Sequence, residues 1–575
     1  MKNIFVKNKF DFSFVYFFIF ILSSILTFII GELYFYVPNG VDYVKYVKYL
    51  EFFGNKSDTT HTGQGLIYYF IVSFVSFTRK GGVSNLNIQN MMNSNIHFAN
   101  FLIYIIGIYG FYLLLRRYKF SKSSILISFT VLNFSIPIFI MRSILKPEVL
   151  AFSLIPWIIL GFERYFEAAN HRNFMIALFP LVICLNIKGS VTAMVGLVLL
   201  IKYFKDIKKD FRKYLVHFLI FILAFSIMFI ENQNINSYNI LEHNLSNETN
   251  YDNKASIDFF TKINKWDFYY FPISPYHNNS AIGITLLDTY GDYFNVFINY
   301  DEHLFFYEKD VSIFVDLEDS DGFKYGKYTL QYFSIIFSFF LYGFGMYYAF
   351  KEKTKFIFYI SPIVGLFVVS LSAFGIPFNH FDPKVGDTLK TNYYSFLIGM
   401  SLIFIISSFF KKIKFTKILI LLILPFLFFS NLGFPKTNQE KINFYLQDKI
   451  QISPFCTVIS LFDNNLKVSD CFDETKKLCD YNIASNDAQI IVEEDLIKIN
   501  IDSNNPIIFV DDNSEKLMIN NQDECKKIVN QGGKVYNPLF ERLRLLPLFN
   551  MLYLICSIIA IIFISINERT KNYGK

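Results

Sequence analysis

The chain has 575 residues, of which 53% are hydrophobic, 19% are aromatic and only 18% are charged. A soluble domain usually carries about a quarter charged residues, so this composition excludes an ordinary soluble protein. The net charge of +6 is modest and its basic residues fall in short clusters between apolar blocks, which is typical of membrane topology signals and not of a nucleic-acid surface.

The first apolar block follows a basic N-terminus. It runs from Phe14 to Ile30 without a small-x-small cleavage site, which predicts an uncleaved helix over about 12–35 and not a signal peptide. Lys2, Lys7 and Lys9 predict that the N-terminus is cytoplasmic.

The later blocks alternate across the membrane when every basic connection is kept inside. Helices are predicted at about 98–115, 123–141, 149–165, 173–187, 190–203 and 214–231, on both sides of the basic runs 351–355 and 411–417, and at 547–566. The expected fold is an all-α polytopic membrane protein of about twelve transmembrane helices. The short apolar stretch 65–78 is expected to lie at the interface, because a span there would invert every later connection.

This path predicts five parts. A membrane module of about seven helices covers 1–231 and includes a first outer loop at 37–97. The other parts are a second outer loop at 232–327, four further transmembrane helices at 328–433, an outer lobe at 434–545, and the last helix with a cytoplasmic tail at 546–575.

The segment 434–545 is polar enough to form a small extracytoplasmic α/β lobe. Short strands are predicted at Thr457–Phe462, Gln489–Glu493 and Pro506–Val510. The stretch Glu524–Val529 precedes Gly532-Gly533 and reads as a helix with a glycine stop.

The cysteine pattern agrees with an oxidising location for this lobe. Four of the six cysteines of the chain fall in it: Cys456, Cys471, Cys479 and Cys525. They predict two disulfides, with three pairings open, and four free thiols are the alternative.

Charged residues stand at outward-facing helix ends, where membrane proteins usually have few cations. They are Arg142, Lys146 and Glu148 in RSILKPE, Lys188 in NIKGS, and Lys384 and Lys390 in HFDPKVGDTLKTNYY. Cations gathered at one interface are suited to bind a lipid phosphate. Snorkelling of single side chains to the headgroups is the alternative.

Carboxylates in the outer loops are the candidates for acid–base chemistry. Asp42 follows the first helix and is a candidate general base, with a helix N-cap as the alternative. Asp288, Asp292 and His303 are candidates for an acceptor groove, with a solvated loop face as the alternative.

Four segments resemble the C-type (GT-C) glycosyltransferase superfamily, which includes protein O-mannosyltransferases and aminoarabinose transferases. They are Asp42 after the first helix, GQGLIYYFIVS at 63–73, RSILKPEVLA at 142–151 and KTNYYSF at 390–396. The resemblance covers roughly 1–400. Many members carry a second acidic residue beside the first-loop Asp, whereas Tyr43 follows Asp42 here, so a requirement for a divalent metal is left open.

The resemblance implies sugar transfer from a polyprenyl phosphate to a glycan, lipid or protein acceptor. Arg142, Lys146, Lys188 and Lys390 would hold the donor phosphate, and Asp42 would be the base of an inverting reaction. Glu148 would orient Lys146 or Arg142. The expected setting is a bacterial inner membrane, with both termini cytoplasmic, the active site extracytoplasmic and membrane lipids, not nucleic acid, as partners.

Two other functions are open. A polysaccharide polymerase or ligase would use lipid pyrophosphates. A lipid or glycan transporter would show discontinuous helices or charges near the bilayer midplane. Soluble-enzyme motifs such as a P-loop, GxSxG or HExxH are absent from the sequence.

Overall fold

The computed structural model describes the helical part of the chain and one small sheet. The described residues are 13–34, 67–80, 88–209, 211–236, 257–263, 265–272, 276–277, 279–294, 321–373 and 389–410, the strands between 489 and 536, and a few single residues at 421, 424, 553, 555 and 559.

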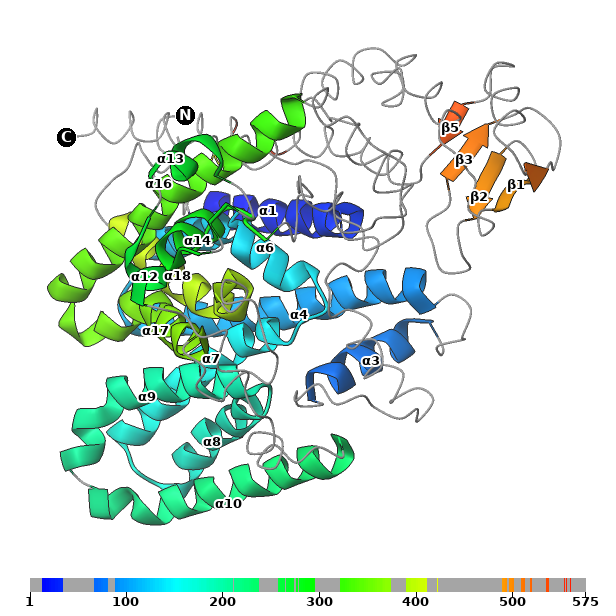
Figure 1. Ribbon diagram of the computed structural model, residues 1–575. Helices are drawn as coiled ribbons and strands as arrows, with labels where there is room; N and C mark the ends of the chain where they lie inside the picture. Colours follow the sequence, from blue (N-terminus) through cyan, green and yellow to red (C-terminus); the bar gives the residue numbers. More distant parts are fainter. Residues whose placement is uncertain are drawn as a thin grey trace, which may run out of the picture.

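The described elements up to residue 410 are all helices (Figure 1). They are α1 Ser13–Tyr34, α3 Ile67–Lys80, α4 Ile88–Arg117, α5 Lys122–Asn133, α6 Ile136–Ser143, α7 Glu148–Glu167, α8 His171–Leu185, α9 Gly189–Lys209, α10 Phe211–Asn236, α12 Ile257–Thr261, α13 Lys265–Tyr270, α14 Ala281–Asp288, α16 Asp321–Lys351, η3 Lys353–Lys355, α17 Phe356–Ala373, η5 Thr391–Tyr393 and α18 Ser395–Phe409.

Several of these helices are suited to cross a membrane. Among the described residues, five are long and apolar enough, within 14–31, 96–117, 148–167, 330–351 and 353–371. The bent pair α5 and α6 adds a sixth if it forms one span. A membrane protein with several spans is therefore supported, and the total of twelve stays a prediction.

The helix predicted over 123–141 is in fact two helices that meet at an angle of 68°. The sequence contains the cause, because Pro137 stands four residues after Asn133. In a continuous helix, Pro137 would lack the N–H that bonds the Asn133 carbonyl, and its ring would clash with that carbonyl. The helix therefore ends at Asn133 and restarts at Ile136.

Helices α4 and α7 pack closely, with constant register. A Cβ at Gly107 would lie 2.7 Å from Ser153 Cα, and one at Gly110 would lie 2.8 Å from the Pro156 ring. Both pairs are 46 residues apart in the chain, as are Arg117 and Glu163, which form an ion pair at 3.7 Å. The two helices are therefore parallel, and glycine is required where their backbones approach.

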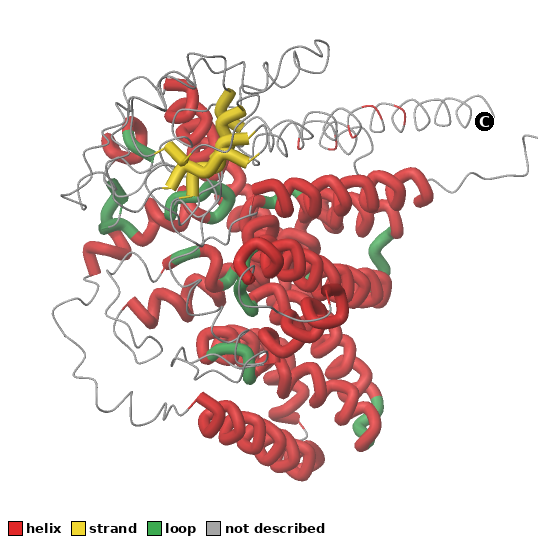
Figure 2. Tube along the Cα trace, turned by 90° about the vertical axis from the view of Figure 1, so that its right-hand side faces the viewer, coloured by secondary structure: helices red, strands yellow, loops and turns green. Residues whose placement is uncertain are grey.

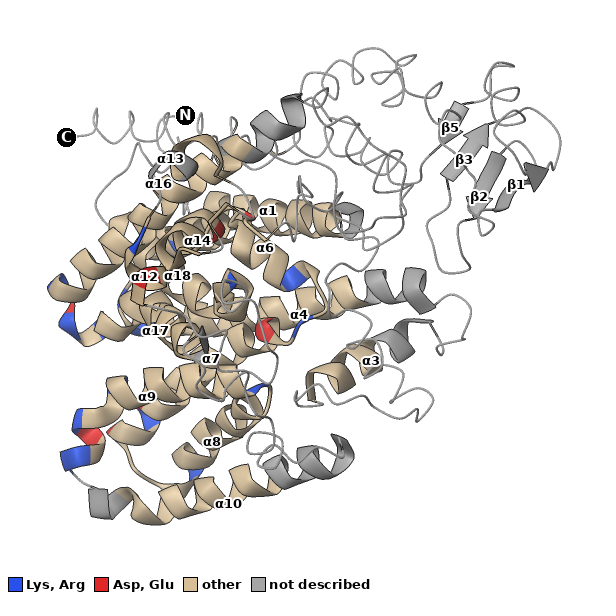
Figure 3. Ribbon diagram, in the orientation of Figure 1, with Lys and Arg blue, Asp and Glu red and all other residues tan. Residues whose placement is uncertain are grey.

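Helices α7 and α9 are also parallel, and an ion pair joins them at each end. Lys188 Nζ lies 3.2 Å from Glu148 Oε1, and Lys202 Nζ lies 2.9 Å from Glu163 Oε1. We call these the Lys188 end and the Lys202 end of the helices. Figure 3 shows that the described helices carry few charges along their lengths and that coloured residues gather where α9 ends and where α16 turns into α17.

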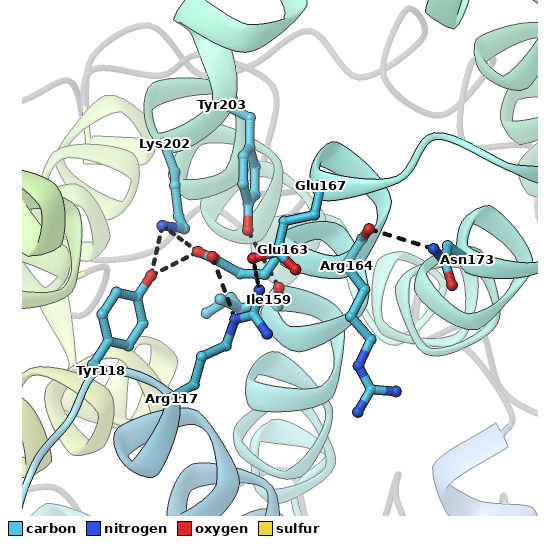
Figure 4. Close-up of polar contacts among 9 residues, drawn as sticks. All are labelled: Arg117, Tyr118, Ile159, Glu163, Arg164, Glu167, Asn173, Lys202 and Tyr203. Atoms are coloured by element: carbon cyan, nitrogen blue, oxygen red, sulfur yellow. Dashed lines mark hydrogen bonds and ion pairs between the residues drawn. The ribbon is translucent and has the colours of Figure 1, made fainter.

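The Lys202 end is a connected network of charges and aromatic rings (Figure 4). Glu163 accepts hydrogen bonds from Tyr118 at 2.6 Å and from Lys202, which also donates to the Tyr118 hydroxyl at 2.9 Å. Lys355, in the turn between α16 and α17, lies 4.3 Å from the centre of the Phe120 ring. Four connections that the sequence predicts on one side of the membrane thus meet at one end of the helices.

The last described elements form a five-stranded antiparallel sheet, whose strands are yellow in Figure 2. The strands are β1 Gln489–Glu493, β2 Leu496–Asn500, β3 Ile508–Asp511, β4 Met518–Ile519 and β5 Lys534–Tyr536, in the order β4-β1-β2-β3-β5. The predicted strand at 489–493 coincides with β1, and the one at 506–510 overlaps β3. The strand predicted at 457–462, the helix at 524–529 and the four lobe cysteines lie outside the described residues.

Candidate functional site

The turn between α6 and α7 carries Lys146 and is flanked by Arg142 at the end of α6 and Glu148 at the start of α7, and a buried amide holds it in place. The Asn100 side chain in α4 donates to the Ile144 carbonyl at 2.9 Å. Its Oδ1 accepts from the Tyr68 hydroxyl of α3 at 2.8 Å. Both side chains are fully buried, and burial raises the pKa of the Tyr68 hydroxyl far above its ordinary value, so Tyr68 remains a neutral donor.

Arg142 is the most deeply buried cation of the site. It lies in the last turn of α6 with only 4% of its surface exposed. Its guanidinium carbon is 5.1 Å from the centre of the Tyr104 ring and 5.8 Å from that of Phe139. Among the residues that the structure describes, its Nη1 and Nη2 have no hydrogen-bond partner. Such a group favours an anion, because a buried charge without a partner is costly.

The ring below Arg142 is fixed by the break between α5 and α6. The Tyr104 hydroxyl donates to Asn133 Oδ1 at 2.8 Å. The amide nitrogen of Asn133 donates to the hydroxyls of Ser23 at 2.8 Å and Ser24 at 2.9 Å in the middle of α1. The guanidinium therefore rests on a ring that three helices hold.

Two further cations meet on one aromatic ring. Lys188 Nζ is 4.6 Å and Lys146 Nζ is 5.6 Å from the centre of the Tyr393 ring, within the range of cation–π attraction. Lys188 also pairs with Glu148, which is almost fully buried and whose second oxygen has no hydrogen-bond partner among the described residues. The two lysines at this ring have one buried carboxylate between them, so this group carries a net positive charge.

Asp288 ties the second predicted outer loop to the segment that bears Tyr393. Its Oδ2 accepts from the Thr391 N–H at 2.7 Å and its Oδ1 from the Tyr293 N–H at 3.1 Å. Lys390, one residue before η5, lies 5.1 Å from the centre of the Phe294 ring. Burial raises the pKa of Tyr394 well above its ordinary value, so this phenol is neutral.

The structure thus brings together some predicted residues and separates others. Lys146 and Lys188 meet at Tyr393, and Glu148 pairs with Lys188 instead of with Lys146 or Arg142. Arg142 lies in α6, against the Tyr104 ring of α4. Lys390 faces the 288–294 segment. Asp42 and His303 lie outside the described residues.

Asp288 and Asp292 are not exposed to solvent, as residues of a solvated loop face would be. Both are buried, with 8% and 1% of their surfaces exposed. Asp288 binds backbone N–H groups, and the Asp292 N–H donates to Gln331 Oε1 at 3.2 Å. No cluster of three metal-ligating side chains occurs in the part of the chain that the structure describes.

Reasoning from sequence missed the neutral residues that position the cations. Two signals could have found most of them. Tyr68 and Tyr393 lie in the segments GQGLIYYFIVS and KTNYYSF. Asn100 and Asn133 are polar residues within apolar helices, where such residues are rare. Tyr104 gave no such signal, because it is one of many aromatic residues in α4.

Comparisons of the chain with protein-family models, with curated proteins and with solved structures find no match.

Proposed function

We propose that this protein is a membrane glycosyltransferase that moves a sugar from a polyprenyl-phosphate donor to a glycan, lipid or protein acceptor. The observation that supports it is the buried guanidinium of Arg142, whose Nη1 and Nη2 have no hydrogen-bond partner among the described residues. It lies four residues before Lys146, which shares the Tyr393 ring with Lys188. A phosphate offers the acceptor oxygens that a guanidinium binds best. A lipid-borne phosphate fits because the cations lie at the end of apolar helices.

In the proposed reaction, the cations stabilise the leaving group. The bond between the anomeric carbon and the phosphate oxygen breaks, and Arg142, Lys146 and Lys188 stabilise the charge that develops on that oxygen. Asp42 takes the proton of the acceptor hydroxyl as its oxygen bonds the anomeric carbon from the opposite face. Glu148 orients Lys188, with which it is paired at 3.2 Å.

The proposal places this site on the extracytoplasmic face of a bacterial plasma membrane, with both termini in the cytoplasm. It retains about twelve spans and an extracytoplasmic α/β lobe at 434–545. The assignment of sides rests on the basic connections, which the positive-inside rule places in the cytoplasm.

The test is release of the lipid phosphate. With an acceptor hydroxyl compound supplied, the full chain in liposomes should convert radiolabelled polyprenyl-phosphate hexoses to polyprenyl phosphate as the hexose passes to the acceptor. Lys188→Ala should slow this at least about tenfold. Arg164→Ala, at the other end of α7, is the matched control and should keep the wild-type rate. Cleavage only of pyrophosphate-linked glycans would indicate a polymerase or ligase instead.

One observation favours a second candidate, a lipid or glycan transporter. The bent pair α5 and α6 is a discontinuous helix, and Arg142 lies buried in its second half. Transporters build substrate sites at such breaks. Movement of a labelled polyprenyl-phosphate hexose across the liposome membrane without cleavage of its glycosidic bond would support this candidate and contradict the transferase.

A further inference from the structure

Tyr393 is the point at which the cationic group depends on a distant part of the chain. The two ammonium groups approach its ring from the residue before α9 and from the turn before α7. Cation–π attraction needs the charge within about 6 Å of the ring centre, and Lys146 at 5.6 Å is already near that limit. A small shift of the ring would therefore release Lys146 first.

The position of Tyr393 is set by η5, a single turn of three residues. Within the turn, the Tyr393 N–H donates to the Lys390 carbonyl at 3.0 Å. At its start, the Thr391 N–H donates to Asp288 Oδ2 at 2.7 Å, a charge-assisted bond to a buried carboxylate. This bond joins η5 to Asp288, which lies 103 residues earlier in the chain.

Asp288 is itself anchored, so it can hold the turn. Its Oδ1 accepts from the Tyr293 N–H, and Ser334 and Ser338 of α16 donate to the Leu286 carbonyl at 2.8 and 3.1 Å. The end of α14 is thus fixed to a long helix, and the Asp288 carboxylate transfers that constraint to η5.

We infer that Asp288 is a positioning residue for the anion site: its carboxylate fixes η5 and so keeps the Tyr393 ring between Lys146 and Lys188. The inference rests on the proposed function only for the presence of an anion at these lysines. Asp288 would thus control binding of the donor phosphate instead of lining an acceptor groove.

The probe is farnesyl phosphate, and the readout is protection of Lys188. The full chain in detergent is acetylated with an amine-reactive ester, and modification of Lys188 is followed by mass spectrometry at increasing farnesyl phosphate. We expect Asp288→Asn, which keeps one acceptor oxygen and loses the other, to raise the half-protecting concentration roughly tenfold. Asp258→Asn is the matched control, because this carboxylate is 62% exposed in the same loop, and it should leave protection unchanged.

A second variant covers the event that Asp288→Asn fails to fold. Thr391→Pro removes the N–H that Asp288 binds, and proline is well tolerated at the first position of a helix. It should weaken protection to a similar extent while Asp288 is intact.

The double variant separates positioning from a general structural effect. Tyr393→Leu removes the shared ring and should weaken protection by itself, and Asp288→Asn should then add little, because it acts through that ring. Independent, multiplying effects of the two substitutions would overturn the inference, as would normal protection in Asp288→Asn. If farnesyl phosphate fails to protect Lys188 in the wild type, the anion site and the proposed function fall with it.

Discussion

Arg142 combines deep burial with the lack of a hydrogen-bond partner among the described residues. A side chain retained for stability would be expected to have its charge compensated, as Lys202 has by Glu163 at the other end of the helices. A buried charge without a partner is costly, so its replacement by an apolar side chain should be neutral or stabilising, whereas removal of one member of a buried pair is destabilising. The two cations should therefore respond in opposite ways to the same substitution.

We expect Arg142→Met to leave the free energy of unfolding unchanged or to raise it by up to about 3 kcal/mol, while phosphate binding is lost. Lys202→Met is the matched comparison and should lower stability, since it leaves Glu163 without its nearest cation. Thermal unfolding in detergent and Lys188 protection by farnesyl phosphate measure the two effects. Strong destabilisation by Arg142→Met would make Arg142 a structural residue.

Asp42→Asn tests the proposed base, because it preserves size and removes basicity. Transfer should fall at least about a hundredfold, while folding and donor binding persist. An N-cap role predicts full activity instead, because Asn caps a helix about as well as Asp. In that event Glu148 becomes the next candidate for the base, since one of its oxygens is without a hydrogen-bond partner among the described residues.

The cationic residues of the site could be predicted from the sequence. Arg142, Lys146 and Lys188 stand at predicted outward-facing helix ends, where the positive-inside rule leads one to expect few cations, and this can be seen in one sequence. The ring that joins two of them could not. Tyr393 is one of 38 tyrosines, and its role depends on a contact between segments more than 200 residues apart. No local pattern encodes such a contact.

Among the secondary-structure elements, the break between α5 and α6 has the most consequence for the site. Asn133 accepts from Tyr104 and donates to two serines of α1, so a single amide links three helices. Asn133→Leu should lower the free energy of unfolding by about 2 kcal/mol, because it leaves the buried Tyr104 hydroxyl without its acceptor. Ser23→Ala should cost less than about 1 kcal/mol, because Ser24 still accepts from the amide. Equal losses in the two variants, in denaturant unfolding in detergent, would contradict this assignment.

The network at the Lys202 end should hold α4, α7 and α9 together. Glu163→Gln removes the charge that Lys202 and Arg117 share, and should lower the free energy of unfolding by about 1–2 kcal/mol, less than for a fully buried pair because Glu163 is partly exposed. The exposed pair of Asp258 and Lys262 is the control, and Asp258→Asn should change stability by about 0.5 kcal/mol or less. A Glu163→Gln variant as stable as the control would show that packing alone holds these helices.

For the whole molecule, the structure groups connections in the way the topology predicts. The Lys202 end contains the turns near 117–122, 168–170 and 352–355 and the last turns of α9. The other end contains the connections near 144–147, 188 and 390. Single-cysteine labelling with an impermeant reagent should therefore report residues near 210, 353 and 413 as cytoplasmic and those near 300 and 500 as external. External labelling near 210 would overturn the whole path.

Helix positions were predictable because apolar length is a local property, and α1, α7 and α8 begin and end within two residues of their predicted bounds. The change of direction between α5 and α6 was not predicted. This bend of 68° depends on one proline. The helix α4 is longer than predicted, because its first turns, from Ile88, are too polar for a hydropathy criterion.

The spacing of the two ends has a consequence for the surrounding lipid. Glu148 and Glu163 are separated by about 22 Å along α7, and α8 and α18, with 15 residues each, have about the same length. The hydrocarbon layer of a typical bilayer is about 30 Å thick. The charged positions of α7, and α8 and α18 over their whole lengths, therefore extend over less than this layer, although α7 itself is long enough to cross it. Hydrophobic mismatch of this kind is relieved by local thinning, which draws headgroups inward. A lipid-linked phosphate would then reach Lys188 without leaving its leaflet, and the same protein in thicker bilayers should bind it more weakly.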